Sequence, residues 1–301
     1  MMEVVAIMST QFRNYLVVVK ENSKDAQTCA DTVCSLLKEH GAHVQAVVSE
    51  RSPETLKAGA SKSDVIIVLG GDGTILGTAR VLLGQDKPIF GINFGKVGFL
   101  AETDPDNLEK ALAGLCSGKY IIQRYIALEW EIKRRGEAIA NGYAINDVVI
   151  ARGRAARTIQ LNLSINAIEL SRLHCDGIII SAPLGATGYA VSAHGPLAFP
   201  SLDAVIVTPV SPFAGAFPPL VMPSGSRASV LACKSNGETV LTIDGQDVVD
   251  ISAGDMIEVT GSQKKVAMLV SESDWYWRRL VQRGFVMPGP GRYHLDSART
   301  V

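Results

Sequence analysis

The sequence lacks the marks of several large protein classes, and the first of these is a basic excess. Its 301 residues carry a formal net charge of −1, whereas a protein that binds nucleic-acid backbones in bulk needs a surplus of positive side chains. No apolar run approaches the ~20 residues of a transmembrane helix. The N-terminus has neither the basic start nor the cleavage site of a signal peptide. We therefore expect a soluble, cytoplasmic protein with neither nucleic acid nor a membrane among its partners.

The chain also lacks paired cysteines. Its five cysteines are an odd number and form no Cys-x-x-Cys pair, which argues against a disulfide framework and against a zinc site. We expect buried, reduced thiols instead. Hydrophobic residues make up 47% of the chain and charged residues 20%, so enough apolar side chains are present for a large core.

The first 121 residues alternate short apolar runs with helical patterns. Continuous apolar strands between helices are typical of a parallel sheet that is covered on both faces. The patterns predict strands over 3–8, 43–49, 64–70 and 87–93, and helices over 25–41, 74–84 and 104–115.

After about residue 121 the spacing of apolar residues changes from the helical period to a period of two residues. The segment 158–170, "TIQLNLSINAIEL", alternates apolar and polar residues, which predicts a half-buried antiparallel strand. "SNGE" at 235–238 suggests a hairpin turn between two strands. Further strands are expected over 240–246, 255–261 and 265–271, and a helix over 273–285.

These patterns predict an α/β plus β-rich fold. We expect a Rossmann-like parallel sheet with helices over 1–121 and an antiparallel β-rich domain over 122–272. The segment 273–301 would add a C-terminal helix and tail that return to the first domain.

The stretch "VIIVLGGDGTIL", residues 65–76, raises the question of what Asp72 does. Asp-Gly between apolar residues is often a hairpin turn, but here an apolar strand precedes it and a helical pattern follows. Strand, glycine loop and helix form an arrangement that points backbone N–H groups at an anion. Neither the phosphate-loop nor the Gly-x-Gly-x-x-Gly motif is present. A carboxylate in such a loop can take a hydroxyl proton during phosphoryl transfer, which suggests a kinase.

Six segments resemble those of NAD kinases and occur in that family's order, and the resemblance extends over roughly residues 65–285. Sphingosine, diacylglycerol and phosphofructo-type kinases also use Gly-Gly-Asp-Gly, so the full series is the more specific signal. The segments are "GGDGTIL" (70–76), "INFGKVGFLAE" (92–102), "AINDVVIARG" (144–153), "DGIIISAPLGATGYAVSAHGPLAF" (176–199), "VTPVSPF" (207–213) and "TIDGQ" (242–246).

The resemblance implies roles for matching residues. Asp72 would be the catalytic proton acceptor for the 2′-hydroxyl of the adenosine ribose, with the Asn146–Asp147 pair holding adenine and ribose. The donor phosphate loop would be Gly70, Gly71, Gly73 and Thr74. The remaining implied contacts to NAD are Gly73, Arg157, His174, Asp176, Leu184, Thr187, Gly188, Tyr189, Ala190, Val191, Ser192 and Gln246.

The resemblance also implies cofactors and an assembly. ATP or another phosphate donor would act with Mg²⁺ or another divalent metal, for which no ligand residue is assigned. A homodimer or homotetramer is implied as well.

Several interpretations stay open at this point. Leu184, Ala186, Phe213 and Pro218 depart from the family pattern, which leaves NAD versus NADH and ATP versus polyphosphate undecided. A lipid or sphingoid-type kinase, or a non-catalytic dinucleotide-binding regulator, are the alternatives. Taken without the resemblance, Asn146–Asp147 could be a strand bulge or an edge device, Asp176-Gly177 a hairpin turn and Thr187 a helix cap.

Overall fold

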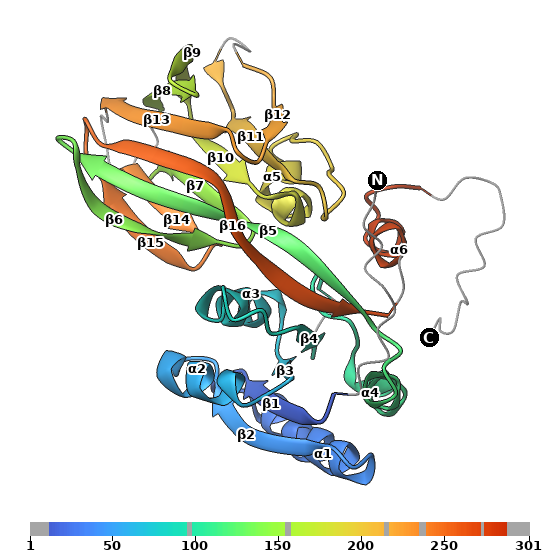
Figure 1. Ribbon diagram of the computed structural model, residues 1–301. Helices are drawn as coiled ribbons and strands as arrows, with labels where there is room; N and C mark the ends of the chain where they lie inside the picture. The colour runs from blue at the N-terminus through green and yellow to red at the C-terminus, as the bar shows by residue number, and fades with distance from the viewer. Residues whose placement is uncertain are drawn as a thin grey trace.

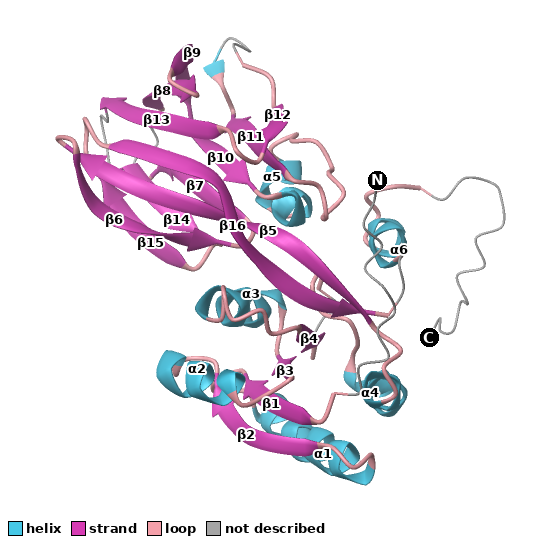
Figure 2. Cartoon of the chain, in the orientation of Figure 1, coloured by secondary structure: helices cyan, strands magenta, loops and turns pink. Residues whose placement is uncertain are grey.

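The computed structural model describes residues 12–94, 98–153, 158–213, 217–234, 239–271 and 274–287. It has one part that combines helices with parallel strands and a second part built almost wholly of strands (Figures 1 and 2). No helix in these ranges is both long and apolar enough to cross a membrane.

The α/β part begins with four parallel strands in the order β2-β1-β3-β4. They are β1 (Asn14–Val19), β2 (His43–Ser49), β3 (Val65–Leu69) and β4 (Ile89–Ile92). The helices are α1 (Lys24–Glu39), α2 (Pro53–Ser61), α3 (Asp72–Val81) and α4 (Leu108–Cys116), the last preceded by the 3-10 turn η1 (Pro105–Asn107). Strand β1 lies in a β-branched run, "NYLVVV", that the sequence analysis missed, while the predicted strand 3–8 lies outside the described residues.

Helices cover both faces of this parallel sheet, as predicted. Side chains of α1 and α4 share one core cluster with alternate residues of β1 and β3, such as Val17 and Ile67. Side chains of α2 and α3 share another with the intervening residues, such as Leu16 and Ile66. The strands are therefore buried on both sides, which explains their continuous apolar sequences.

The β-rich part continues the same sheet and adds a second one. Strand β16 pairs with β4 in parallel and with β5 and β13 antiparallel, so a single ten-stranded sheet spans both parts. Figure 1 shows β5 and β16 running side by side from one part to the other. The additional strands of this sheet are β5 (Ile121–Arg134), β6 (Glu137–Ala144), β8 (Ile159–Ile165), β9 (Ile168–Cys175), β13 (Arg227–Lys234) and β16 (Met256–Val270).

The second sheet is six-stranded and packs on the first. Its order is β12-β11-β10-β7-β14-β15, and every pairing is antiparallel. The strands are β7 (Asp147–Arg152), β10 (Gly177–Ser181), β11 (Ala204–Val210), β12 (Leu220–Pro223), β14 (Thr239–Ile243) and β15 (Asp247–Ile251). Between β10 and β11 lie the 3-10 turn η2 (Pro183–Thr187) and the short helix α5 (Tyr189–Ser192). The apolar faces of both sheets form one core.

Three predictions about the β-rich part were wrong in detail. The segment 158–170 is a hairpin, with Asn166 and Ala167 at φ 50° and 67° in its turn. The turn at 235–238 lies outside the described residues, but the strands that flank it, β13 and β14, belong to different sheets and cannot form a hairpin. The segments 255–261 and 265–271 form one strand, β16, with an irregularity after Gly261.

The C-terminal helix α6 (Trp275–Gln282) returns to the α/β part, as expected. Its Trp275 and Tyr276 rings contact Phe99 edge to face, and the Tyr276 hydroxyl donates to the Ala198 carbonyl at 2.7 Å. Helix α6 therefore bridges the two parts. The predicted boundaries at 121/122 and 272/273 stay predictions, since β16 makes one sheet of both parts.

Candidate active site

Asp72 lies where β3 ends and α3 begins. Gly70 donates its N–H to the Ile92 carbonyl at 2.9 Å, and a Cβ at Gly70 would lie 2.6 Å from the Thr74 hydroxyl, so only glycine fits. Gly71 is the extended N-cap, and Asp72 is the first residue of α3. The predicted strand–loop–helix is confirmed and the hairpin alternative is excluded. The loop sits at the carboxyl edge of a parallel sheet, where such folds usually bind ligands.

Backbone groups of a neighbouring segment hold the Asp72 carboxylate. The Phe99 N–H donates to Oδ2 at 2.6 Å and the Leu100 N–H to Oδ1 at 3.1 Å. A Cβ at Gly98 would lie only 1.8 Å from Oδ1, so this segment can lie on the carboxylate only with glycine at that position. Asp72 is half-buried, and two backbone N–H donors fix the position of its carboxylate.

Helix α3 is tied to the β14–β15 turn by two side chains. Gln246 donates through Nε2 to the Gly73 carbonyl at 2.5 Å. Arg80 donates through Nη1 to an Asp244 carboxylate oxygen at 3.3 Å and through Nη2 to Asp247 at 2.5 Å. This turn belongs to the second sheet, so the contacts join Asp72's helix to the β-rich part.

Asp244, in the β14–β15 turn, binds backbone groups of the β-rich part. It adopts φ 51° in the tight β14–β15 turn, and its side chain is fully buried. Its Oδ1 accepts the N–H groups of Ile145, Asn146 and Asp147 at 2.9, 2.7 and 3.2 Å. The sequence analysis missed Asp244 and Arg80, although both lie in or beside quoted motifs, "TIDGQ" and "GGDGTIL".

The Asn146–Asp147 pair lies between two strands of different sheets. β6 ends at Ala144 in the first sheet and β7 begins at Asp147 in the centre of the second. The pair is therefore neither a bulge nor an edge device, because the chain changes sheets there. Asn146 Oδ1 is buried, with no hydrogen-bond partner among the described residues.

Two neighbouring residues here, Asp147 and Asp244, carry buried carboxylates. Burial and the neighbouring Asp244 raise the pKa of Asp147 to about 7. Burial also raises the pKa of Asp244, while the N–H groups that it accepts and Arg80 act in the opposite direction. Asp147 is therefore a carboxylate whose charge changes near neutral pH.

The glycine-rich segment after β10 packs on this pair. A Cβ at Gly185 would lie 2.3 Å from the Asn146 carbonyl, and one at Gly188 would lie 3.9 Å from Asp147 Oδ2. Gly188, not Thr187, is the N-cap of α5. Leu184, Ala186 and Ala190 are buried in the core, whereas Gly188, Tyr189 and Ser192 are exposed, with Thr187 and Val191 half-buried.

Asp176 and His174 do not lie at the Asn146–Asp147 site of their own chain. Ser181 pairs with Asp147 and Gly177 with Ala151, so Asp176 lies beyond the far end of β10, more than about 13 Å away at ~3.3 Å per residue. Asp176 instead pairs with Arg152 at 2.8 Å. It is not in a hairpin turn, since β9 and β10 belong to different sheets. His174 is exposed on β9, and Arg157 lies outside the described residues.

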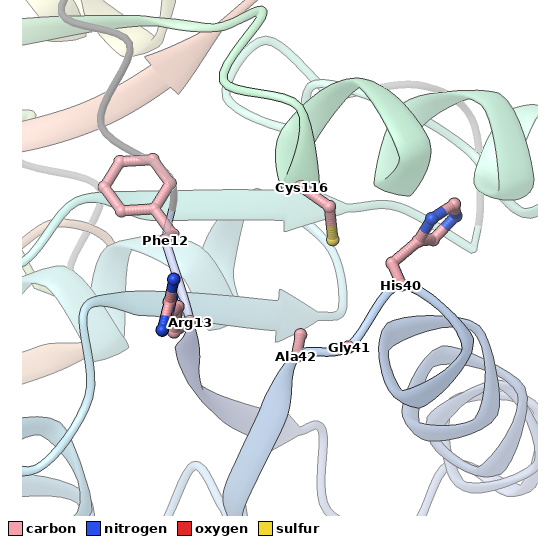
Figure 3. A pocket seen from close by; sticks show the side chains of 6 residues that line it. All are labelled: Phe12, Arg13, His40, Gly41, Ala42 and Cys116. Carbon is pink, nitrogen blue, oxygen red and sulfur yellow. The ribbon is translucent and has the colours of Figure 1, made fainter.

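A cavity of about 150 Å³ lies elsewhere, at the opposite edge of the parallel sheet. Figure 3 shows Arg13, His40 and Cys116 around it, at the start of β1 and the ends of α1 and α4. Asp72 follows the carboxyl end of β3, which is parallel to β1, so this cavity is separate from the Asp72 site.

Replacing Asp147 with asparagine should remove a pH-dependent cost to folding. With the folded-state pKa at about 7 and an unfolded value near 3.9, both states are protonated below pH ~4. Between pH ~4 and ~7 only the unfolded chain loses the proton, so the stability of the parent falls as pH rises. We expect Asp147→Asn to gain a few kcal/mol relative to the parent across that window, measured by urea unfolding. The exposed Asp250→Asn is the control, and parallel curves for parent and Asp147→Asn would contradict the raised pKa.

Comparison with known proteins places this geometry in a family. The family models of the ATP-NAD kinase N-terminal and C-terminal domains match residues 3–120 and 145–271. A curated NAD kinase of Nitratidesulfovibrio vulgaris (strain DSM 19637 / Miyazaki F) is 39% identical over 93% of this chain and 99% of its own length. One from Lawsonia intracellularis is 34% identical over 91% of this chain and 96% of its own.

Solved structures agree on the fold. An NAD kinase from Archaeoglobus fulgidus in complex with ATP has a TM-score of 0.72 at 27% identity, covering 90% of this chain and 98% of that one. Yeast NADH kinase complexed with NADH has a TM-score of 0.79 at 21% identity, covering 93% of this chain and 90% of that one. With both domains matched in order and relatives that align almost from end to end, the chain belongs to the NAD kinase family.

Proposed function

We propose that this chain phosphorylates the 2′-hydroxyl of the adenosine ribose of NAD to give NADP. One observation carries the proposal: the Asp72 carboxylate, fixed by two backbone N–H groups, lies on a helix that Gln246 and Arg80 tie to the Asp244 turn. Asp244 in turn holds the Asn146–Asp147 backbone. A proton acceptor and a polar pair suited to adenosine thus belong to one hydrogen-bonded unit.

Asn146, Asp147 and the α5 segment would bind the acceptor. The unpartnered Asn146 Oδ1 can accept a hydrogen bond from an exocyclic amino group of adenine, and the Asp147 carboxylate can accept from ribose hydroxyls. Gly188 beside Asp147 Oδ2 allows close approach of the ligand. The exposed or half-buried side chains of this segment, Thr187, Tyr189, Val191 and Ser192, would line the dinucleotide, whereas Leu184 and Ala190 shape its backbone from the core.

Asp72 would act as the proton acceptor. As the ribose 2′-oxygen attacks the terminal phosphorus, an O–P bond forms and the bond to the leaving nucleoside diphosphate breaks. The hydroxyl proton passes to the carboxylate. The loop of Gly70, Gly71, Gly73 and Thr74 presents backbone to the donor phosphates at the start of α3.

ATP with magnesium is the proposed donor, as in the Archaeoglobus fulgidus complex with ATP. The described residues include no group of three or more His, Cys, Asp or Glu side chains that could hold a metal. We therefore treat magnesium as part of the metal–nucleotide substrate, held mainly by phosphate oxygens and water, where it screens the phosphate charge.

A homodimer or homotetramer and a cytoplasmic location belong to the same proposal. Asp176 and His174 lie beyond the far end of β10 and on an edge strand, and an adjoining subunit would bring such residues to another site. All five cysteines are free, which suits a reducing compartment.

NADP formation from NAD, ATP and magnesium tests the function. We expect turnover with NAD and none with sphingosine or diacylglycerol, because Leu184 is only 3% exposed and packs in the core, where it cannot contact a lipid chain. NADH and polyphosphate, run in parallel, determine acceptor and donor preference. An increase in melting temperature with NAD but no NADP would instead identify a non-catalytic binding protein.

A further inference from the structure

Helix α6 places a buried arginine beside the segment that holds Asp72. The Arg279 side chain is 10% exposed and pairs through Nη2 with Glu102 at 3.0 Å, where Glu102 is 6% exposed. Its Nη1 donates to the Phe99 carbonyl oxygen. Glu102 also accepts the Ser271 N–H at 2.8 Å, so the ion pair is fixed on both sides. A charged group is retained in such surroundings only where its hydrogen bonds are made.

The carbonyl that Arg279 contacts belongs to the same peptide group as the Leu100 N–H. That N–H donates to Asp72 Oδ1 at 3.1 Å. One peptide unit therefore connects the guanidinium to the carboxylate, with its C=O facing the cation and its N–H facing the anion. Hydrogen bonds that share a peptide in this way polarise one another, and each becomes stronger.

Helix α6 also fixes the side chain of the same residue. The Phe99 ring packs edge to face on Trp275 at 6.0 Å and on Tyr276 at 5.7 Å between ring centroids. Phe285, just beyond the helix, lies at 6.4 Å. Phe99 also donates its own N–H to Asp72 Oδ2. Helix α6 therefore holds both the backbone and the ring of Phe99, although Arg279 and Phe99 are 180 residues apart in the sequence.

We propose that Arg279 is a positioning residue for phosphoryl transfer: it orients the 99–100 peptide, which in turn orients the Asp72 carboxylate towards the acceptor hydroxyl. The inference rests on the proposed role of Asp72. Because small displacements of a reacting group cost up to about 10²-fold in rate, loss of this contact should lower kcat and leave KM almost unchanged.

Arg279→Gln and Glu102→Gln form a matched pair of variants. Both break the same buried ion pair and should lower the melting temperature. Only Arg279→Gln removes the cation from the Phe99 carbonyl, so we expect its kcat to fall about 10-fold with KM for NAD and ATP within about twofold of the parent. Glu102→Gln should keep kcat within about twofold, and Arg279→Lys, which retains the charge, should recover part of the rate.

Two further variants keep the test decisive. The double variant Arg279→Gln with Glu102→Gln leaves no unpaired buried charge, so it reports on the rate even if the single variant folds poorly. In an Asp72→Asn background, Arg279→Gln should cause little further loss, because the contact acts through Asp72. Equal kcat losses in Arg279→Gln and Glu102→Gln, or an undiminished loss in the Asp72→Asn background, would overturn the inference. Parental activity of Asp72→Asn would instead overturn the proposed role of Asp72.

Discussion

Asp72→Asn is expected to lower kcat for NAD phosphorylation by about 10²-fold or more, since a positioned general base contributes 10²–10⁴-fold. The amide has the shape of the carboxylate but cannot accept the hydroxyl proton. It also presents an NH₂ group towards one of the two backbone donors, Phe99 or Leu100, that now bind the carboxylate. KM for NAD should stay within about threefold, because the contacts assigned to adenosine lie at Asn146 and Asp147. Initial rates of NADP formation over a range of both substrates measure this.

Asp104→Asn is the matched control for this change. Asp104 is likewise an aspartate at the start of a helical turn, where its side chain accepts the Asn107 N–H at 3.1 Å, and asparagine caps helices as well as aspartate does. The control should have the parental rate and melting temperature. A parental rate in Asp72→Asn would rule out the proposed base even if the chain phosphorylates NAD.

Asp244→Ala is expected to cause the largest loss of stability among the changes considered, about 3–5 kcal/mol, the range for removal of one partner from a buried ion pair. The substitution leaves the N–H groups of Ile145, Asn146 and Asp147 without their acceptor. It also deprives Arg80 of its buried partner and places alanine at φ 51°, which aspartate tolerates better. Relief of repulsion on Asp147 offsets part of this loss. Urea unfolding of parent and variant gives the difference in free energy.

Asp247→Ala is the control for this prediction, because Asp247 pairs with the same Arg80 but its side chain is 64% exposed. Exposed pairs contribute at most about 1 kcal/mol, so we expect a small loss. Asp244→Asn should fall between the two variants, since it keeps an acceptor oxygen for the three N–H groups. Equal losses of unfolding free energy in Asp244→Ala and Asp247→Ala would show that the buried contacts of Asp244 do not add to the stability.

Asp244→Ala should also weaken acceptor binding where the protein remains folded. Asp244 fixes the backbone of Asn146 and Asp147, so its loss should raise KM for NAD more than it lowers kcat. The Arg279 variants should have the opposite pattern. This contrast separates the two sides of the site, one holding the acceptor and the other holding the base.

Much of the fold could be predicted because it depends on patterns within short stretches of the sequence. Apolar runs between helical patterns predicted the covered parallel sheet, and the period of two predicted the β-rich part. The prediction of a hairpin turn at 235–238 was wrong, because a short stretch of sequence does not show which strands pair with each other. β13 and β14 are neighbours in sequence, yet each pairs with strands far away in the chain.

Some parts of the candidate site could likewise be predicted from short stretches of sequence, and others could not. Asp72 and its glycine loop are local: a strand, a tight turn and a helix start lie within twelve residues, and their pattern predicts a carboxylate at the carboxyl edge of a sheet. Asn146–Asp147 could be singled out as polar residues in an apolar run, but their position between two sheets could not. Leu184 was expected to contact a ligand, and only the packing of the chain shows that its side chain is buried.

By itself, the sequence determined the two kinds of architecture, the glycine loop with Asp72 and the family resemblance, because each depends on residues close together along the chain. The tertiary structure alone decided how Asp72 is held. Arg80 meets Asp244 across 164 residues, and Arg279 meets Glu102 across 177. Charged side chains that look solvent-exposed in sequence become buried partners only when the strands have paired, since no local period encodes a contact over such separations.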